Sequence, residues 1–225
     1  MKPIVLLLIL ASMLAAQDKK ASEERFSTYY MQKKSLFELL PDDPGEIIFL
    51  GNSITDGCEW SELFRNPLIK NRGISGDITE GILFRLNEVT AAQPEKIFLM
   101  IGVNDLAAGK TVDSIVTNYR LIIETIRHDS PKTKLYLQSV LPVNAAYPRF
   151  KNHVDKSDSI LVLNKHIKAL AQEYGLTYVD LHTAFRQEDG QMNPEYSNDG
   201  LHLTGAGYIL WKKLIDAYIS ESEGQ

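Results

Sequence analysis

Short apolar, β-branched runs alternate with longer segments of helical period along most of the chain. Parallel strands need a crossover, usually a helix, so this order predicts βαβ units. The run Ile97-Phe98-Leu99-Met100-Ile101 is continuously apolar, which is typical of a strand covered by helices on both faces. The pattern therefore predicts an α/β fold, a three-layer αβα sandwich with about five parallel strands.

The predicted elements can be given by residue range. The strands are expected at Glu46 to Leu50, Leu68 to Arg72, Lys96 to Ile101, Lys134 to Val140 and Thr177 to Asp180. The helices are expected at roughly Ser22 to Leu40, Ile78 to Ala92, Val112 to His128, Ser157 to Tyr174 and Thr204 to Ser220. The irregular stretch from Leu141 to Lys156 is long for a loop in such a fold, and is either functional or a packed surface excursion.

The first sixteen residues have the composition of a secretory signal peptide. Lys2 precedes an apolar run from Ile4 to Ala16, and the charged stretch Asp18-Lys19-Lys20 follows it. The run is shorter than the ~20 apolar residues that a membrane-spanning helix needs. We expect residues 1–16 to be removed on export, to the periplasm or beyond, and residues 17–225 to form a single domain with no stable membrane insertion.

Composition excludes several classes of function. The chain has 225 residues and a net charge of -5, so it offers no electrostatic reason to bind nucleic acid. Its single cysteine, Cys58, permits neither an intrachain disulfide nor a thiolate metal cluster. Paired histidines on one helix face and the Gly-Lys-Ser/Thr of a P-loop are both missing. We therefore expect no metal and no cofactor.

Polar, glycine-rich segments follow three of the strands and precede the last helix. In an open parallel sheet, ligands meet the carboxyl ends of the strands. The four segments are Gly51-Asn52-Ser53-Ile54-Thr55-Asp56-Gly57, Asn71-Arg72-Gly73-Ile74-Ser75-Gly76-Asp77, Gly102-Val103-Asn104-Asp105 and Asp199-Gly200-Leu201-His202.

These segments hold the side chains that make a serine nucleophilic. A serine hydroxyl needs a base to take its proton, and the base works best when a carboxylate fixes its tautomer. Ser53, His202 and Asp199 supply these three groups. A tetrahedral oxyanion then needs preorganised donors. The candidates are the backbone N–H groups of Ser53 and Gly76 and the side-chain amide of Asn104, and a glycine at 76 lets the backbone approach the substrate.

The blocks GNSITDG, NRGISGD, GVND and DGLH resemble, in order and spacing, the four sequence blocks of the SGNH hydrolases, also called the GDSL esterase and lipase family. The resemblance implies a flavodoxin-like sandwich and a serine esterase. It implies Ser53 as nucleophile, His202 as base and Asp199 as the residue that orients it. In the same way it implies that Ser53, Gly76 and Asn104 form the oxyanion hole.

Two features of the sequence bear on what this resemblance implies. Asn52 stands where the name sequence Gly-Asp-Ser-Leu has its aspartate, and the stretch from Asn71 to Leu86 is similar to the acetylhydrolase branch. We therefore expect an exported esterase that removes short acyl groups, most simply acetyl, from a small-molecule or glycan ester. The alternatives are a lysophospholipase or thioesterase of the same family and a non-catalytic carbohydrate-binding protein. The sequence does not indicate an oligomeric state.

Several of these residues also have simpler interpretations. One alternative is that Ser53 serves merely as the cap of the following helix. Another is that Asn104 and Asp105 merely close a turn. Asp77 and Asp105 are expected to organise their loops. His182 follows Asp180 and forms a rival pair. The remaining histidines, His128, His153 and His166, are predicted to be surface residues, Cys58 a buried one, and Trp60 either a core residue or part of an acyl pocket.

Overall fold

The computed structural model describes residues 25–221, and the chain divides into two units, Met1–Leu39 and Leu40–Gln225. In the first unit, α2 (Thr28–Phe37) begins after Ser27, whose hydroxyl accepts a hydrogen bond from the Tyr30 N–H at 3.1 Å. This cap starts the helix at Thr28, later than predicted, and the helix ends at Phe37, before the predicted Leu40. The predicted signal peptide lies outside the described residues, and the single domain over 17–225 stays a prediction.

The second unit is built on one parallel sheet. Its strands are β1 (Ile47–Gly51), β2 (Ile69–Gly73), β3 (Lys96–Met100), β4 (Lys134–Gln138) and β5 (Thr177–Val179), in the order β2-β1-β3-β4-β5. All four neighbouring pairs are parallel, and Gly51 and Gly73 pair at the carboxyl ends of β1 and β2. The five-stranded parallel sheet predicted from the sequence is confirmed.

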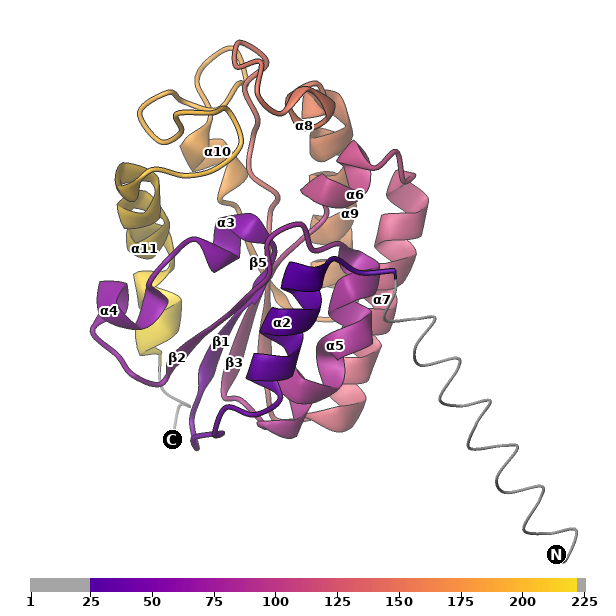
Figure 1. Cartoon of the computed structure of the whole chain (residues 1–225), viewed down its shortest axis with the longest axis vertical. Coiled ribbons are helices and arrows are strands. Elements are labelled where there is room, and N and C mark those ends of the chain that lie inside the picture. The colour runs from indigo at the N-terminus through magenta and orange to yellow at the C-terminus, as the bar shows by residue number, and fades with distance from the viewer. Residues whose placement is uncertain (1–24, 222–225) are drawn as a thin grey trace, which may run out of the picture. The chain divides into compact units, whose positions relative to one another are not determined.

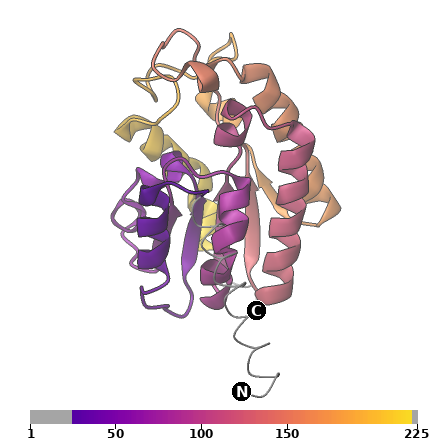
Figure 2. The same cartoon turned by 45° about the vertical axis from the view of Figure 1, so that its right-hand side comes forward.

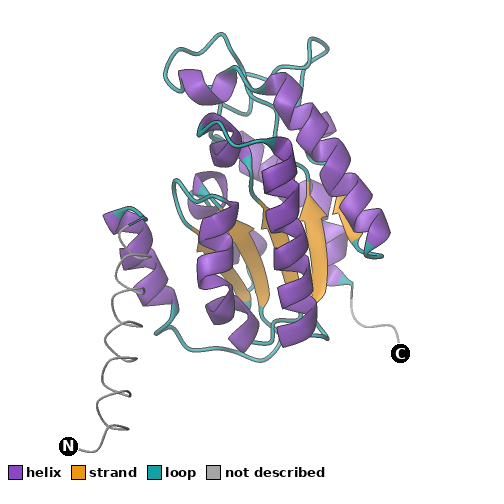
Figure 3. Cartoon of the chain, turned by 90° about the vertical axis from the view of Figure 1, so that its right-hand side faces the viewer, coloured by secondary structure: helices purple, strands orange, loops and turns teal. Residues whose placement is uncertain are grey.

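Helices cover both faces of this sheet. The helices α5 (Thr79–Ala91), α7 (Val112–Asp129) and α9 (Ser157–Glu173) pack in sequence on one face, where Figures 2 and 3 show them in front of the strands. The helices α4 (Trp60–Phe64) and α11 (Gly205–Ser220) contact each other on the other face (Figure 1). The predicted three-layer αβα sandwich is therefore confirmed.

The central strands carry the core. Every residue of β1 and β3 is buried, as expected for strands covered on both sides. Phe49 of β1 stacks on Phe98 of β3 and on Trp60 of α4, with ring centroids 5.2 and 3.9 Å apart, and Trp211 of α11 meets Trp60 edge to face. These aromatic contacts fix the α4 and α11 layer on the sheet.

The fourth strand ends two residues before its predicted end at Val140. Asn164 of α9 takes both backbone groups of Val140: its amide oxygen accepts the N–H at 2.8 Å, and its amide nitrogen donates to the carbonyl at 2.8 Å. The residue before Val140 is Ser139, whose hydroxyl oxygen accepts hydrogen bonds from the backbone N–H groups of Leu181 and His182. Because the Asn164 side chain satisfies the backbone groups of Val140, these groups need no partner strand, and the chain can leave the sheet here.

Short helices at the carboxyl ends of the strands were not among the predicted elements. They are α3 (Ser53–Asp56), α6 (Val103–Ala107), α8 (Lys151–Val154) and α10 (His182–Phe185), and they lie towards the top of Figure 1. Each has about one turn, too few residues to show a hydrophobic period. One of them, α8, lies within the stretch from Leu141 to Lys156 that was expected to be irregular.

Candidate active site

Ser53 is the first residue of α3, directly beyond the end of β1. The cap of this helix is Asn52, whose side-chain oxygen accepts from the Ile54 N–H at 3.1 Å. The alternative that Ser53 serves only as a helix cap is therefore wrong, since Asn52 does so. The asparagine that replaces the aspartate of the family's name sequence thus keeps an acceptor at the cap, and leaves the Ser53 hydroxyl available for other partners.

The turn that carries Ser53 is packed closely on the two strand ends. A Cβ added to Gly73 would lie 2.1 Å from the Asp56 backbone nitrogen, and one added to Gly51 would lie 2.3 Å from the Thr55 hydroxyl oxygen. Only glycine at these two positions allows α3 to approach the sheet so closely. The Asp56 carboxylate also accepts from the Ser75 N–H and hydroxyl, which joins α3 to the loop that contains Gly76.

His202 joins Ser53 and Asp199 in one chain of hydrogen bonds. Its Nε2 lies 3.0 Å from Ser53 Oγ, and its Nδ1 lies 2.9 Å from Asp199 Oδ2. An ionised carboxylate can only accept, so Nδ1 carries the proton and Nε2 faces the serine as an acceptor. The structure thus brings together the three residues chosen from the sequence, in the arrangement that a general base and its nucleophile require.

The Asp199 carboxylate is held in its ionised form. Its other oxygen accepts from the backbone N–H groups of Leu201 and His202 at 2.9 and 2.8 Å. Partial burial acts to raise the pKa of Asp199, but the hydrogen bonds from His202 and Leu201 outweigh it and lower the pKa below its ordinary value. A charged Asp199 is the form that stabilises a protonated imidazole beside it.

The three candidate oxyanion donors border this serine. Gly76 has a φ of +83°, a left-handed conformation that favours glycine. Within residues 25–221, the N–H groups of Ser53 and Gly76 donate to no acceptor of the protein. Asn104 follows Gly102, whose φ is +125°, in the first turn of α6. One N–H of its amide donates to the Asp77 carbonyl at 2.8 Å, and the second N–H remains for a substrate.

A buried ionic cluster lies beneath the loop that holds Gly76. Arg85 of α5 donates to Asp77 Oδ2 and also to the carbonyls of Gly51 and Arg72. The Glu88 carboxylate accepts from the guanidinium groups of both Arg72 and Arg85. Burial raises the pKa of Glu88, and the two guanidinium groups only partly offset this. The arginine at 85 thus fastens the ends of β1 and β2 to the residue after Gly76.

Asp105 has a structural position, as expected from the sequence. Its carboxylate accepts from the Thr79 hydroxyl at 2.6 Å and from the Thr79 N–H at 3.1 Å. Burial raises the pKa of Asp105, an effect that these hydrogen bonds oppose. The contact fixes the start of α5 against α6. Asp105 and Asp77 therefore both organise the loops that carry the oxyanion candidates.

The rival candidates lie elsewhere. Asp180 accepts from the N–H and hydroxyl of Thr183, while His182 is buried and its backbone N–H donates to Ser139.

Cys58 is buried, and burial raises the pKa of its thiol to about 12, so it is not a nucleophile. Trp60 stacks on Phe49, and its indole N–H donates to the Thr55 carbonyl. Of the two interpretations of Trp60, the structure supports a core residue.

One residue near the site was not predicted from the sequence. His153 of α8 was expected at the surface, but it is partly buried and its Nε2 lies 3.0 Å from Asn104 Oδ1. The neighbouring Phe150 meets the His202 ring edge to face, with centroids 4.9 Å apart. No sequence signal marks this pair, because α8 is a single turn in an irregular segment. By contrast, His128 and His166 are exposed, as predicted.

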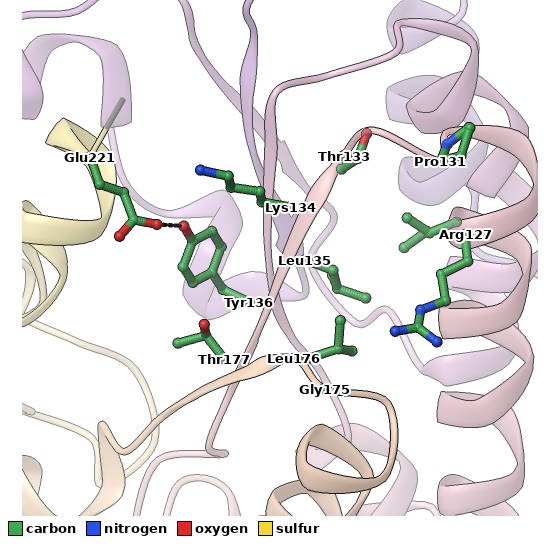
Figure 4. Close-up of a pocket in the computed structure, with 11 residues that line it drawn as sticks. Arg127, Pro131, Thr133, Lys134, Leu135, Tyr136, Gly175, Leu176, Thr177 and Glu221 are labelled. Carbon is green, nitrogen blue, oxygen red and sulfur yellow. Dashed lines mark hydrogen bonds between the residues drawn. The ribbon is translucent and has the colours of Figure 1, made fainter. Parts of the chain in front are cut away.

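Described residues line a cavity far from the catalytic cluster and another beside it. One of about 380 Å³ is at the opposite edge of the sheet, at the first residues of β4 and β5; Figure 4 shows Arg127 and Lys134 beside it, and the hydrogen bond between Tyr136 and Glu221. The other, of about 370 Å³, is lined by residues 148–153 next to the site. Its walls include Phe150 and His153, so the segment from Leu141 to Lys156 does contribute to the surroundings of the candidate triad.

Acidic, histidine and cysteine side chains do not gather into a metal site in the part of the chain that the structure describes. Among residues 25–221, no group of three or more His, Cys, Asp or Glu side chains is arranged to hold a metal ion.

No helix of the described part has the length and apolar character to cross a bilayer.

Known proteins resemble this chain in sequence and structure. Residues 49–210 match the GDSL-like Lipase/Acylhydrolase family. Platelet-activating factor acetylhydrolase IB subunit alpha1 of Homo sapiens is 27% identical over 173 residues, which cover 74% of this chain and 72% of that protein. A GDSL-like lipase from Bacteroides thetaiotaomicron has a TM-score of 0.75 and 28% identity, covering 84% and 96%. A catalytic mutant of an acetylxylan esterase from Geobacillus stearothermophilus has a TM-score of 0.63 and 18% identity, covering 81% and 97%, which shows likeness of fold.

Proposed function

Since the chain belongs to the GDSL-like lipase/acylhydrolase family and is an ester hydrolase of that type, we propose that it removes short acyl groups, most simply acetyl, from carbohydrates or similar polar alcohols. The observation that carries this proposal is the continuous chain of hydrogen bonds from Ser53 Oγ through the His202 ring to the Asp199 carboxylate. Ser53, His202 and Asp199 each take a defined part in the reaction.

Acylation begins at the serine. Ser53 Oγ attacks the ester carbonyl carbon, and His202 Nε2 takes the hydroxyl proton as the new C–O bond forms. The carbonyl oxygen becomes an oxyanion, which the N–H groups of Ser53 and Gly76 and the free N–H of Asn104 stabilise. Asp199 stabilises the imidazolium. When the tetrahedral intermediate collapses, the bond to the alcohol breaks and His202 returns its proton to the departing alcohol oxygen.

Deacylation uses the same groups with water as the nucleophile. His202 takes a proton from water, whose oxygen attacks the acyl-enzyme carbonyl, and the second oxyanion is held by the same donors. Collapse releases the carboxylic acid and returns the proton to Ser53 Oγ. No cofactor enters the balance of either step.

The preference for a short acyl group rests on relatives and on the sequence. The relative from Homo sapiens is named an acetylhydrolase, and the stretch from Asn71 to Leu86 is similar to that branch of the family. A lysophospholipase or thioesterase would instead prefer longer acyl chains. The hydrogen-bonded triad favours catalysis over the non-catalytic, carbohydrate-binding alternative.

The test compares p-nitrophenyl acetate, butyrate and octanoate with the wild type, Ser53→Ala and the matched control Ser114→Ala, an exposed serine on α7. We expect the wild type and the control to hydrolyse acetate fastest, and Ser53→Ala to lose at least ~10⁴-fold in kcat. A fluorophosphonate should label the wild type and Ser114→Ala but not Ser53→Ala. Equal rates in all three proteins would exclude the proposed nucleophile, and rates that rise with chain length would favour the alternative. Acetylated sugars and acetylated xylan then identify the alcohol.

Export is a separate part of the proposal. The apolar run from Ile4 to Ala16 supports a cleaved signal peptide. Expression of the full chain in a bacterial host, followed by mass measurement of the protein outside the cytoplasm, should give a chain that begins at or near Gln17. A protein that keeps its first sixteen residues would contradict this expectation.

A further inference from the structure

His153 reaches the candidate oxyanion hole from a segment that carries no residue of the triad. It belongs to α8, which is held by backbone hydrogen bonds from the His153 N–H to the Phe150 carbonyl at 2.8 Å and from the Lys156 N–H to the His153 carbonyl at 3.1 Å. The adjacent Val154 is buried in the core. These contacts fix the backbone on both sides of the imidazole, so the position of its ring is set by the fold.

The Asn104 amide can have only one orientation between its two neighbours. The Asp77 carbonyl is an acceptor without a proton, so the amide nitrogen must face it, as the 2.8 Å contact has it. The amide oxygen then faces His153 Nε2 at 3.0 Å. Because that oxygen is an acceptor, His153 must donate, and its proton must be on Nε2. The second amide N–H points away from both partners.

We propose that His153 is a positioning residue of the oxyanion hole, which holds the Asn104 amide in the orientation that presents its free N–H to the substrate. A donor on the amide oxygen also polarises the amide and strengthens its N–H groups. This role deepens the proposed function and rests on it, because the amide donates to an oxyanion only if the ester reaction takes place here.

The neutral form of His153 suits this role. Burial lowers the pKa of His153, and the nearby His202 lowers it further. A neutral imidazole with its proton on Nε2 still donates to Asn104, and it does not oppose the positive charge that forms on His202 during the reaction.

Phe150 connects the same segment to the catalytic base. Its ring meets His202 edge to face at 4.9 Å between centroids and meets His153 edge to face at 5.9 Å. One short segment therefore packs against the base and, through His153, orients an oxyanion donor.

The kinetic test uses His153→Ala, His153→Gln and, as a matched control, the exposed His166→Ala. His153→Ala should lower kcat for p-nitrophenyl acetate by ~10-fold or more with KM within about twofold, less than the ~100-fold loss of a whole donor. Glutamine can donate to the same oxygen, so His153→Gln should recover most of the rate. In an Asn104→Ala background, His153→Ala should cause no further loss. A full additional loss there, or a raised KM at unchanged kcat, would overturn the assignment.

A second measurement is independent of activity. Ring ¹⁵N chemical shifts of the wild type should show His153 as the neutral tautomer with its proton on Nε2, assigned by the signals that disappear in His153→Gln. In Asn104→Ala this tautomer preference should weaken. A proton on Nδ1 in the wild type would overturn the proposed hydrogen bond even if the protein is an esterase. Loss of the ester reaction alone, with the tautomer as expected, would instead contradict the proposed function.

Discussion

The Arg85 guanidinium donates to one oxygen of Asp77 twice, from Nε at 3.0 Å and from Nη2 at 2.9 Å, and neither side chain is exposed to solvent. The same Nη2 reaches the carbonyls of Gly51 and Arg72. The Asp77 carbonyl in turn accepts from Asn104. This buried ion pair therefore links the strand ends before Ser53 and Gly76 to the third oxyanion candidate.

Burial of the Asp77 carboxyl should make the free energy of unfolding depend on pH in an unusual direction. Burial raises the pKa of Asp77 to about 6 from its ordinary 3.8, although the contact with Arg85 opposes the shift. A carboxyl with a higher pKa in the folded state binds more protons when folded, so its contribution to the free energy of unfolding falls as pH rises from about 4 to about 6. Over that interval the wild type should lose about 3 kcal/mol relative to Asp77→Asn.

Urea unfolding of both proteins at pH 4 and pH 7 measures this difference, with Asp216→Asn, an exposed aspartate on α11, as the matched control. If the difference in the free energy of unfolding between wild type and Asp77→Asn is the same at both pH values, the carboxyl does not titrate as described. A gap that changes in the opposite direction would mean that the ion pair outweighs burial.

Asn104→Ala should impair the chemical step. The substitution removes one oxyanion donor, which typically costs about 3 kcal/mol of transition-state stabilisation. We expect kcat for p-nitrophenyl acetate to fall by ~100-fold or more with little change in KM. Asn104→Asp, of almost the same shape, should be worse, because a carboxylate accepts and repels the oxyanion. Unchanged kcat in both variants would remove Asn104 from the hole.

Asp199→Asn should inactivate the protein without unfolding it. The asparagine oxygen can still accept from the backbone N–H groups of Leu201 and His202. Its NH₂ group, however, would favour the wrong tautomer of His202, so kcat should fall by about 10⁴-fold. Thermal unfolding should stay close to the wild type, and a fluorophosphonate should label Ser53 much more slowly. A variant with near wild-type kcat would show that another group orients the base.

Gly73→Ala should disturb the nucleophile turn from outside the site. Its Cβ would lie 2.1 Å from the Asp56 backbone nitrogen, which cannot move without α3. We expect a large loss of stability and of activity, measured by thermal unfolding and ester hydrolysis. Gly205→Ala is the matched control, since a Cβ there meets nothing within 4 Å at the start of α11, and alanine favours a helix. Similar behaviour of the two variants would contradict the close packing of α3 on β2.

The regular elements could be predicted because their periods are local. The apolar run at 97–101 and the helical pattern at 112–128 each show their secondary structure within their own residues. The ends were less predictable: β4 stops at Gln138 because Asn164, in another element, takes the backbone groups of Val140. One-turn helices such as α3 and α8 contain no full period and were therefore not predicted.

The candidate site divides in the same way. The residue types and their order along the chain were sufficient to choose Ser53, Asp199 and His202, because an activated serine requires those chemical groups. His153 could not be chosen, since its hydrogen bond to Asn104 spans 49 residues of the chain and depends on how the segment from Leu141 to Lys156 folds back.

By itself, the sequence determined the alternation of strands and helices, the glycines at the strand ends and the side chains capable of the chemistry. Only the tertiary structure decided that His202 Nε2 lies 3.0 Å from Ser53 Oγ across a separation of 149 residues. The physical reason is that parallel strands with helical crossovers place all their carboxyl ends at one edge, while no local interaction brings these two residues together. The contact therefore depends on the packing of the whole sheet and its helices.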